Sequence, residues 1–492
     1  MNTANKQRDR VRLERIAHDA MIEYDLVPDF PQEVLAELKK IKEPLSIPAN
    51  ERLVDMRSVL WCSLDNDDSR DLDQLAAAEA LDNGRVKILI AIADVDAVVK
   101  KDSAIDLHAQ QNTSSVYTAP KVFPMLPEKL STDITSLNFG VDRLAVVVEI
   151  VVSDDGSVLN SAFYRAIVNN KARLSYNSVA AWLDNTGPTP TEMASVAGME
   201  ESLRLQDVTA QKMRLLRHQH GALVFETIEA QPVFSGDSLE DIIPDSPNRA
   251  KEMIEDFMIA ANSVTAKYLA SMNYVSIRRV VSEPKRWDRI VSVVAEHGTK
   301  LPPEPDSKAL AKFLISSKNA DPVRFPDVSL SIIKLLGSGD YVVQMPGGDS
   351  EGHFGLSVQS YTHSTAPNRR YPDLMTQRIL KAAIAGSPAP YTVEELRDLA
   401  QKCNTAENST NKVERKMVKA AAAILLEKRI GDQFDAIVTG AASKGTWVRI
   451  MNPPLEGRLA RGYKGLDVGD SLRVELTSTN VERGFIDFKR VN

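Results

Sequence analysis

Residues 63–93 read SLDNDDSRDLDQLAAAEALDNGRVKILIAIA, an acidic segment followed by two apolar runs. The runs at 75–81 and 86–93 are separated by Asn83-Gly84. Asn and Gly both tolerate positive φ, so this pair suits a type I′ turn, and the stretch therefore predicts a β-hairpin. Residues 76–80 taken alone would also fit a helix, and the turn is what favours strands.

The acidic segment contains five aspartates within nine positions: Asp65, Asp67, Asp68, Asp71 and Asp73. Two interpretations are open: a solvated acidic loop, or a group of carboxylates around a divalent cation. Mg²⁺ prefers hard oxygen ligands and often takes only one or two carboxylates, and a pair of such ions can activate water against a phosphodiester.

The spacing within the segment allows such a site. Asp71 and Asp73 are two positions apart, so in an extended segment both point to the same side, and Asp65 can fold back from the other end of the loop. A calcium-binding EF-hand loop is excluded, because Arg70 and Ala76 stand where that loop requires Gly and Glu.

Composition indicates an ordinary globular protein of several domains. The chain has 492 residues, of which 43% are hydrophobic, and its formal net charge is −7. This length predicts two to four domains, and the net charge argues against non-specific coating of nucleic acid but not against a local basic groove. The two cysteines, Cys62 and Cys403, form no CxxC motif, and the polar N-terminus has no signal-peptide pattern, so we expect a cytoplasmic protein with no membrane segment.

The chain divides into three regions by its patterns, which together predict an α+β multidomain fold. Residues 1–50 show helical spacing and are predicted to form a helical module, either helix-turn-helix-like or a cap on the next domain. Residues 51–430 mix strands with helices, the latter predicted at 199–218, 251–272 and 417–430. Residues 431–492 contain five short β-rich runs, which predict a small closed barrel of the OB-fold type.

A second concentrated signal lies at 353–374, HFGLSVQSYTHSTAPNRRYPDL. Arg369 and Arg370 could bind phosphate groups bidentately, although an ion pair with Asp373 is the alternative. His353 and His363 are too isolated in the sequence to indicate a zinc site, and we expect both to be structural.

Aromatic side chains could stack on the bases of a single strand, since every base offers a π-face. Trp447 and Phe434 in the barrel are predicted to be surface aromatics of this kind, with a packed core position as the alternative.

Several motifs, in this order, resemble the ribonuclease II/ribonuclease R family of exoribonucleases, with a catalytic RNB domain followed by an S1 barrel. The resemblance extends from about residue 60 to the C-terminus. It rests on SLDNDDSRDLD, IADV (92–95), TSSVYTAPKVFPMLPEKLSTDITSLN (113–138), VDRLAV (141–146), GALVF (221–225), IEDFMIAAN (254–262) and SYTHSTAPNRRYPDL (360–374).

The resemblance implies hydrolytic, processive 3′→5′ degradation of single-stranded RNA to nucleoside 5′-monophosphates by a monomer that needs Mg²⁺, with Mn²⁺ as a substitute, and no protein partner. It implies that Asp65, Asp71 and Asp73 are catalytic and bind the metal, and that Arg369 contacts the scissile phosphate. Residues matched to RNA binding are Tyr117 and Phe225 at the 3′ end, and Tyr176, Glu255 and Glu414 along the RNA path, with Arg370 beside Arg369. Trp447 is added to the predicted RNA-binding residues as an aromatic of the barrel.

Two departures from the family pattern affect the prediction. Gln74 stands where the family has a fourth aspartate, which leaves an RNA-binding protein with a degenerate active site as the alternative function. The first fifty residues are too few for the cold-shock barrels that usually precede the RNB domain. A metal-dependent DNA nuclease is a more distant alternative, because sugar selectivity cannot be inferred from these motifs.

Overall fold

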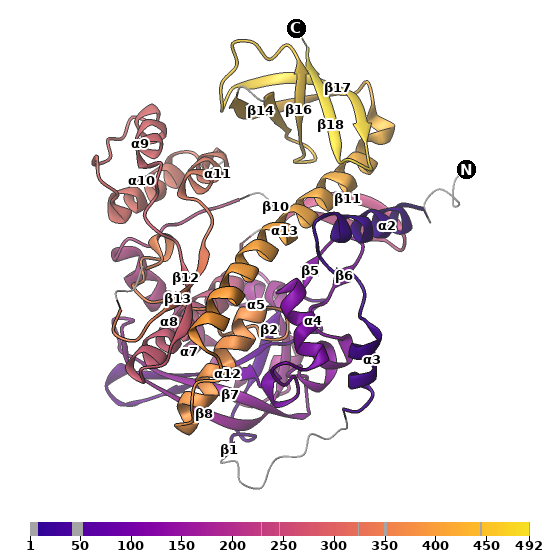
Figure 1. Ribbon diagram of the computed structural model, residues 1–492. Coiled ribbons are helices and arrows are strands. Elements are labelled where there is room, and N and C mark those ends of the chain that lie inside the picture. The colour runs from indigo at the N-terminus through magenta and orange to yellow at the C-terminus, as the bar shows by residue number, and fades with distance from the viewer. Residues whose placement is uncertain are drawn as a thin grey trace.

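The computed structural model describes residues 8–41, 53–227, 229–245, 247–322, 324–348, 352–442 and 445–491. Figure 1 shows a mixed helix and strand body from which one long helix leads to a separate barrel at the C-terminus. The predicted boundary at residues 50–51 lies outside the described residues. No helix in these ranges is long and apolar enough to cross a membrane.

The body is built on a seven-stranded sheet. The predicted hairpin is confirmed: Asn83 and Gly84 have φ of 59° and 72°, and the Arg85 amide donates to the carbonyl of Asp82, as in a type I′ turn. In spatial order the strands are β1 (Val54–Asp55), β8 (Val158–Asn169), β7 (Asp142–Val152), β4 (Val86–Ala93), β3 (Gln74–Ala80), β2 (Cys62–Asp65) and β9 (Ala172–Ser175).

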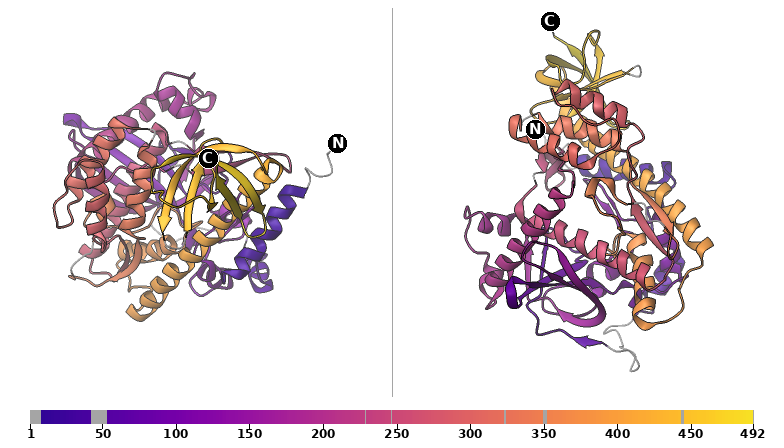
Figure 2. Two further views of the ribbon diagram at one scale, coloured as in Figure 1. Left: turned by 90° about the horizontal axis from the view of Figure 1, so that it is seen from above. Right: turned by 90° about the vertical axis from the view of Figure 1, so that its left-hand side faces the viewer.

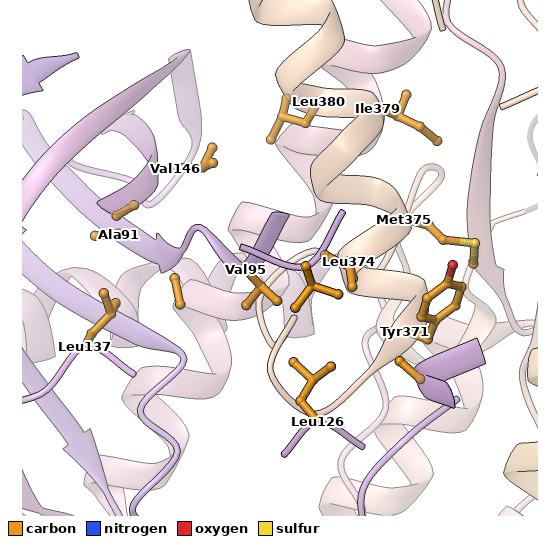
Figure 3. Close-up of a cluster of buried hydrophobic side chains, with 14 of the residues drawn as sticks. Ala91, Val95, Leu126, Leu137, Val146, Tyr371, Leu374, Met375, Ile379 and Leu380 are labelled. Carbon is orange, nitrogen blue, oxygen red and sulfur yellow. The ribbon is translucent and has the colours of Figure 1, made fainter. Parts of the chain in front are cut away.

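Both faces of this sheet are buried, which explains why β4 is apolar at every position except Lys87, near its start. Ile88, Ile90 and Ile92 belong to one core cluster, and the alternate residues Leu89 and Ala91 belong to another. Helix α12 (Tyr371–Ala385) packs in the second cluster, of which Figure 3 shows a part. The first cluster includes residues of α5 (Tyr176–Leu183), α7 (Met199–Gln219) and α8 (Arg249–Ser271), and Met193 of the short helix α6 (Thr191–Ala194).

Helix α13 (Val393–Leu426) connects the body to the barrel (Figure 1). Thr392 and Glu395 form a capping box at its start. The prediction of a helix from residue 417 was wrong about its beginning, which lies 24 residues earlier. The buried face of the first turns includes Ala400 and Cys403, small side chains whose weak apolar periodicity hides the helix in the sequence.

The predicted five-stranded barrel is confirmed as a closed barrel in the order β14-β15-β16-β18-β17. Phe434 takes the packed position that was the alternative to a surface one: it is only 6% exposed and packs edge-to-face against Phe488 inside the barrel. The strands are β14 (Gln433–Ala442), β15 (Gly445–Ile450), β16 (Glu456–Arg461), β17 (Ser471–Asn480) and β18 (Phe485–Arg490).

The predicted N-terminal helices are present as α2 (Arg8–Glu23) and α3 (Gln32–Leu38), and they pack on different partners. Leu13 and Ile16 of α2 share a core cluster with α13 and the barrel, whereas Val34 of α3 packs in the body. This arrangement favours the interpretation as a cap over that as an independent module.

Three helices form a further unit with its own core, inserted between two paired strands. Arg449 of the barrel pairs with Asp327 of this unit at 2.9 Å, and both views in Figure 2 show the two regions next to each other. The unit comprises α9 (Trp287–Glu296), α10 (Ser307–Ala320) and α11 (Phe325–Leu336) between β12 (Ser276–Val280) and β13 (Asp340–Gln344). The remaining elements are α4 (Ala104–Asn112), β5 (Val116–Tyr117), β6 (Val122–Phe123), β10 (Glu229–Ser235) and β11 (Ser238–Asp245).

Candidate active site

The acidic segment joins β2 to β3, two neighbouring antiparallel strands paired at Cys62 and Ala76. Asp65 is the last residue of β2, and Asp73 directly precedes β3. The two ends of the segment therefore lie at the same edge of the sheet, as the prediction that Asp65 folds back requires.

Asp73 is the most buried of these aspartates, at 1% exposure. Its Oδ1 accepts the backbone amide of Asn368 at 2.9 Å, and its Oδ2 accepts the Arg369 Nε–H at 3.0 Å. Burial raises the pKa of Asp73 to about 7 and the charge of Asp71 adds to this, while Arg369 opposes it. The loop before α12 thus supplies both hydrogen-bond donors to a carboxylate removed from water.

Asp71 lies between the other two predicted carboxylates. Its negative charge is one of the influences that raise the pKa of both Asp65 and Asp73. The Tyr117 hydroxyl donates to Asp71 Oδ2 at 3.0 Å, and the Tyr117 amide donates to Glu414 Oε1 of α13 at 3.0 Å. The tyrosine ring remains 43% exposed, so it is available for contact with a ligand.

Asp65 is held by its own loop. Its Oδ1 accepts the Ser69 hydroxyl at 2.9 Å and the Asn66 amide at 2.8 Å, and burial raises its pKa. Tyr176 begins α5 directly after Ser175, which pairs with Asp65 across β2 and β9. The structure therefore brings Tyr176 to the same edge as the carboxylates.

The charge of these carboxylates suits a divalent cation, but their positions do not supply a complete set of ligands. Among the described residues, no three His, Cys, Asp or Glu side chains are close enough to bind one ion together. The site instead presents neighbouring carboxylates whose pKa values burial and mutual repulsion raise, an imbalance that a bound cation would relieve. This fits Mg²⁺, which commonly takes one or two carboxylates and completes its shell with water and substrate phosphate.

The two adjacent arginines have different surroundings. Arg369 faces Asp73, and its side chain is 42% exposed. Arg370 forms the ion pair considered as the alternative, with Asp373 at 2.8 Å, and the backbone amide of Thr365 also donates to that carboxylate. The predicted RNA contact of Arg370 stays a prediction.

Three predicted RNA-binding residues lie on other elements. Phe225 is half-buried against the α9–α11 core, and Glu255 is exposed on α8. Trp447 is half-buried on β15, where with Lys419 and Phe485 it lines a cavity of about 310 Å³.

The two histidines outside the site have the structural character that we expected. His353 and His363 both contact the ring of Tyr361 edge-on, and His363 Nδ1 lies 2.8 Å from the hydroxyl of Tyr341.

Sequence reasoning missed the residues that hold this edge in place. Asn368 contributes its backbone amide to Asp73, and its side-chain oxygen accepts the Thr135 hydroxyl at 2.6 Å. Ser136 accepts the Leu72 amide at 3.0 Å and donates to the Arg70 carbonyl at 3.0 Å. Ordinary polar residues distant in sequence gave no signal for these contacts.

Comparison with protein families identifies two regions. The RNB domain matches residues 53–386, and the RNase II-type exonuclease C-terminal S1 domain matches residues 432–491.

Among full-length relatives, ribonuclease R of Escherichia coli is 29% identical over 501 residues, covering 94% of this chain and 60% of the relative. Ribonuclease R of Aquifex aeolicus is 26% identical, covering 97% of this chain and 70% of the relative. The chain thus spans about three fifths of the length of the first of these relatives.

Two solved structures share the fold. The apo form of Mycoplasma genitalium RNase R superposes with a TM-score of 0.87 at 24% identity, over 98% of this chain and 78% of that one. Yeast Ssd1, described as a pseudonuclease, superposes with a TM-score of 0.70 at 16% identity, over 91% of this chain and 55% of that one. The fold alone therefore does not separate active from inactive relatives, and the residues of the site have to be considered.

Proposed function

The chain belongs to the RNB family, and we propose that it is a hydrolytic exoribonuclease that removes nucleotides from the 3′ end of single-stranded RNA. The products are nucleoside 5′-monophosphates, and degradation is processive. The observation that supports this most directly is the group formed by Asp65, Asp71 and Asp73 with Arg369. It combines anionic oxygen ligands with a guanidinium held in one orientation by Asp73, which is what phosphodiester hydrolysis requires.

In this proposal the carboxylates of Asp65, Asp71 and Asp73 would bind Mg²⁺, one or two to an ion with water and substrate phosphate completing its shell, and Mn²⁺ can substitute. The bound metal would lower the pKa of a water molecule and neutralise charge on the phosphate. Arg369 stabilises the charge that develops on the scissile phosphate, and the hydrogen bond from its Nε to Asp73 fixes the plane of the guanidinium.

Tyr117 gives the site its register on the RNA. Its ring stacks on a base near the 3′ end, while its hydroxyl stays on Asp71 and its amide on Glu414. We propose that the rest of the RNA path is lined by Phe225, Tyr176, Glu255, Arg370 and Trp447.

A second candidate function is RNA binding without cleavage. Gln74 favours it, because a neutral amide holds a metal less tightly than a carboxylate, and the fold also occurs in a protein described as a pseudonuclease. The three aspartates and Arg369 argue for the enzyme.

One experiment separates the two functions. RNA labelled at its 5′ end is incubated with the protein in Mg²⁺, in Mn²⁺ and in EDTA, beside the Asp73→Asn variant and a DNA strand of the same sequence. A short end product that requires metal and RNA and is lost in Asp73→Asn supports the exoribonuclease. Intact RNA in every lane, together with a gel shift, means that the protein only binds RNA, and equal cleavage of DNA would overturn the substrate assignment.

A further inference from the structure

Arg173 lies on the strand next to the acidic segment and has a role that the proposed mechanism leaves open. Strand β9 runs parallel to β2, with Arg173 opposite Ser63 and Ser175 opposite Asp65. Paired residues on neighbouring strands share a face of the sheet, as do residues two apart on one strand. The register therefore puts Arg173 on the same face as Asp65.

The side chain of Arg173 reaches the acidic segment from this position. Its Nη2 donates to the carbonyl oxygen of Ser69 at 2.6 Å. The Ser69 hydroxyl in turn donates to Asp65 Oδ1 at 2.9 Å. Two consecutive hydrogen bonds thus connect the guanidinium to the carboxylate at the end of β2.

The neighbouring helix attaches the same loop at a second point. Asn177 of α5 donates its side-chain amide to Asp67 Oδ2 at 3.1 Å. Asn248, which caps α8, donates to the side chain of Asn177 at 3.3 Å. The turn between Asp65 and Asp71 is therefore held from β9 and from α5, although its own side chains are largely exposed.

The way Arg173 is used distinguishes it from the other arginines near the site. Arg369 and Arg370 form ion pairs with Asp73 and Asp373, whereas the described contacts of Arg173 include no ion pair. Arg173 is also exposed, so its side chain contributes little to the core. Arg173 is a cation near several carboxylates, but it donates to a backbone carbonyl. Its hydrogen bond therefore fixes the shape of the loop.

We propose that Arg173 is a positioning residue, which acts through Ser69 to hold the Asp65 carboxylate where it binds metal. This rests on the proposed function, because it assigns Arg173 a part in the same reaction. Without the hydrogen bond to Ser69, residues 66–70 would sample other turn conformations and Asp65 would lose its fixed orientation.

The test compares four single variants and one double variant of the full chain. Arg173→Met keeps the length of the side chain without its donors, and Arg173→Lys restores one donor. Ser69→Ala removes the second hydrogen bond of the relay. Arg70→Met is the matched control, because it also removes one positive charge, from an exposed arginine within the 66–70 loop that Arg173 contacts.

We expect Arg173→Met to lower kcat about tenfold, equivalent to about 1.4 kcal/mol in the activation free energy. KM should stay within about twofold of wild type, because the change affects the orientation of Asp65 and not RNA binding. Arg173→Lys should recover most of the rate, and Arg70→Met should leave it unchanged. The double variant Arg173→Met/Ser69→Ala should be no slower than the slower single variant, because both changes break one relay.

Two measurements without RNA test the proposal independently of turnover. Hydrogen exchange at residues 66–70 should accelerate in Arg173→Met, and Mn²⁺ binding followed by electron paramagnetic resonance should weaken several-fold. If wild type does not degrade RNA, the proposed function fails, and these two readouts still decide the role of Arg173. Additive rate losses, a change confined to KM, or exchange and Mn²⁺ binding equal to those of Arg70→Met would each overturn the inference.

Discussion

The Nε of Arg369 lies 3.0 Å from Oδ2 of Asp73, which joins a side chain that is 42% exposed to one that is 1% exposed. The two residues are 296 positions apart. Asp73 belongs to the edge of the sheet and Arg369 to the loop before α12, so this ion pair exists only once the body has assembled.

Replacing Arg369 with Lys should lower kcat about 100-fold and change KM little. Lysine keeps the positive charge but lacks the planar donor arrangement that the hydrogen bond to Asp73 holds in one orientation, and losing a preoriented donor to a developing charge costs a factor of about 10²–10³. Single-turnover degradation of labelled RNA checks this. Lys381, which pairs with Asp94 and Asp96 elsewhere in the body, provides a control as Lys381→Arg, for which kcat should stay near wild type.

Replacing Gln74 with Asp should make the protein depend on metal for its stability. Gln74 is 8% exposed and follows Asp73, so a second carboxylate there would cost about 2 kcal/mol in EDTA, a typical cost of burying an unpaired charge. Added Mg²⁺ should restore the Tm of the variant. The new carboxylate should also lower the Mg²⁺ concentration that the variant needs for half-maximal activity. A Tm that stays low at saturating Mg²⁺ would show that position 74 does not face the metal.

The ring and the hydroxyl of Tyr117 should have separable effects. Tyr117→Phe removes the hydrogen bond to Asp71 and keeps the stacking surface, so kcat should fall a few-fold while RNA affinity is retained. Tyr117→Ala also removes stacking, and we expect affinity for a 3′-terminal oligonucleotide to fall about tenfold, since each stacked base contributes about 1–3 kcal/mol. Equal affinities of the two variants would contradict stacking at this position.

Acid should destabilise the folded body through His353. Burial, together with the charge of Arg279, lowers the pKa of His353 to about 4, against an unfolded value of about 6.5. The folded state therefore prefers the neutral ring: its stability is complete above pH ~6.5 and is lost as the pH falls from there towards ~4. At pH 5 the loss is about 1–2 kcal/mol.

Urea unfolding at pH 7.5 and pH 5 measures this loss. His353→Asn should reduce the difference between the two pH values, whereas His220→Asn, at an exposed histidine, should leave it as in wild type. A pH difference unchanged by His353→Asn would contradict the assignment.

The local elements of this protein follow from its sequence because their causes are local. Asn83-Gly84 specifies the hairpin turn, the apolar run of β4 indicates a strand covered on both faces, and the alternating runs after residue 433 specify the barrel. The acidic segment could be singled out in the same way, because five aspartates lie within nine positions, whereas the roles of Asp65, Asp71 and Asp73 were implied by the family resemblance.

Only the tertiary structure decided how these pieces meet. The start of α13 was missed because small residues, Ala400, Cys403 and Ala406, occupy much of its first buried face. The choice between surface and core was left open for Phe434, because the direction in which a strand residue points depends on barrel closure. Asn368, which donates to Asp73, and Arg173, which donates to the Ser69 carbonyl beside Asp65, are common polar residues brought to the acidic segment by packing. A hydrogen bond between residues hundreds of positions apart leaves no trace in local spacing, because it forms only after burial has fixed both backbones. The sequence could therefore indicate the chemistry of the site but not the geometry that holds it.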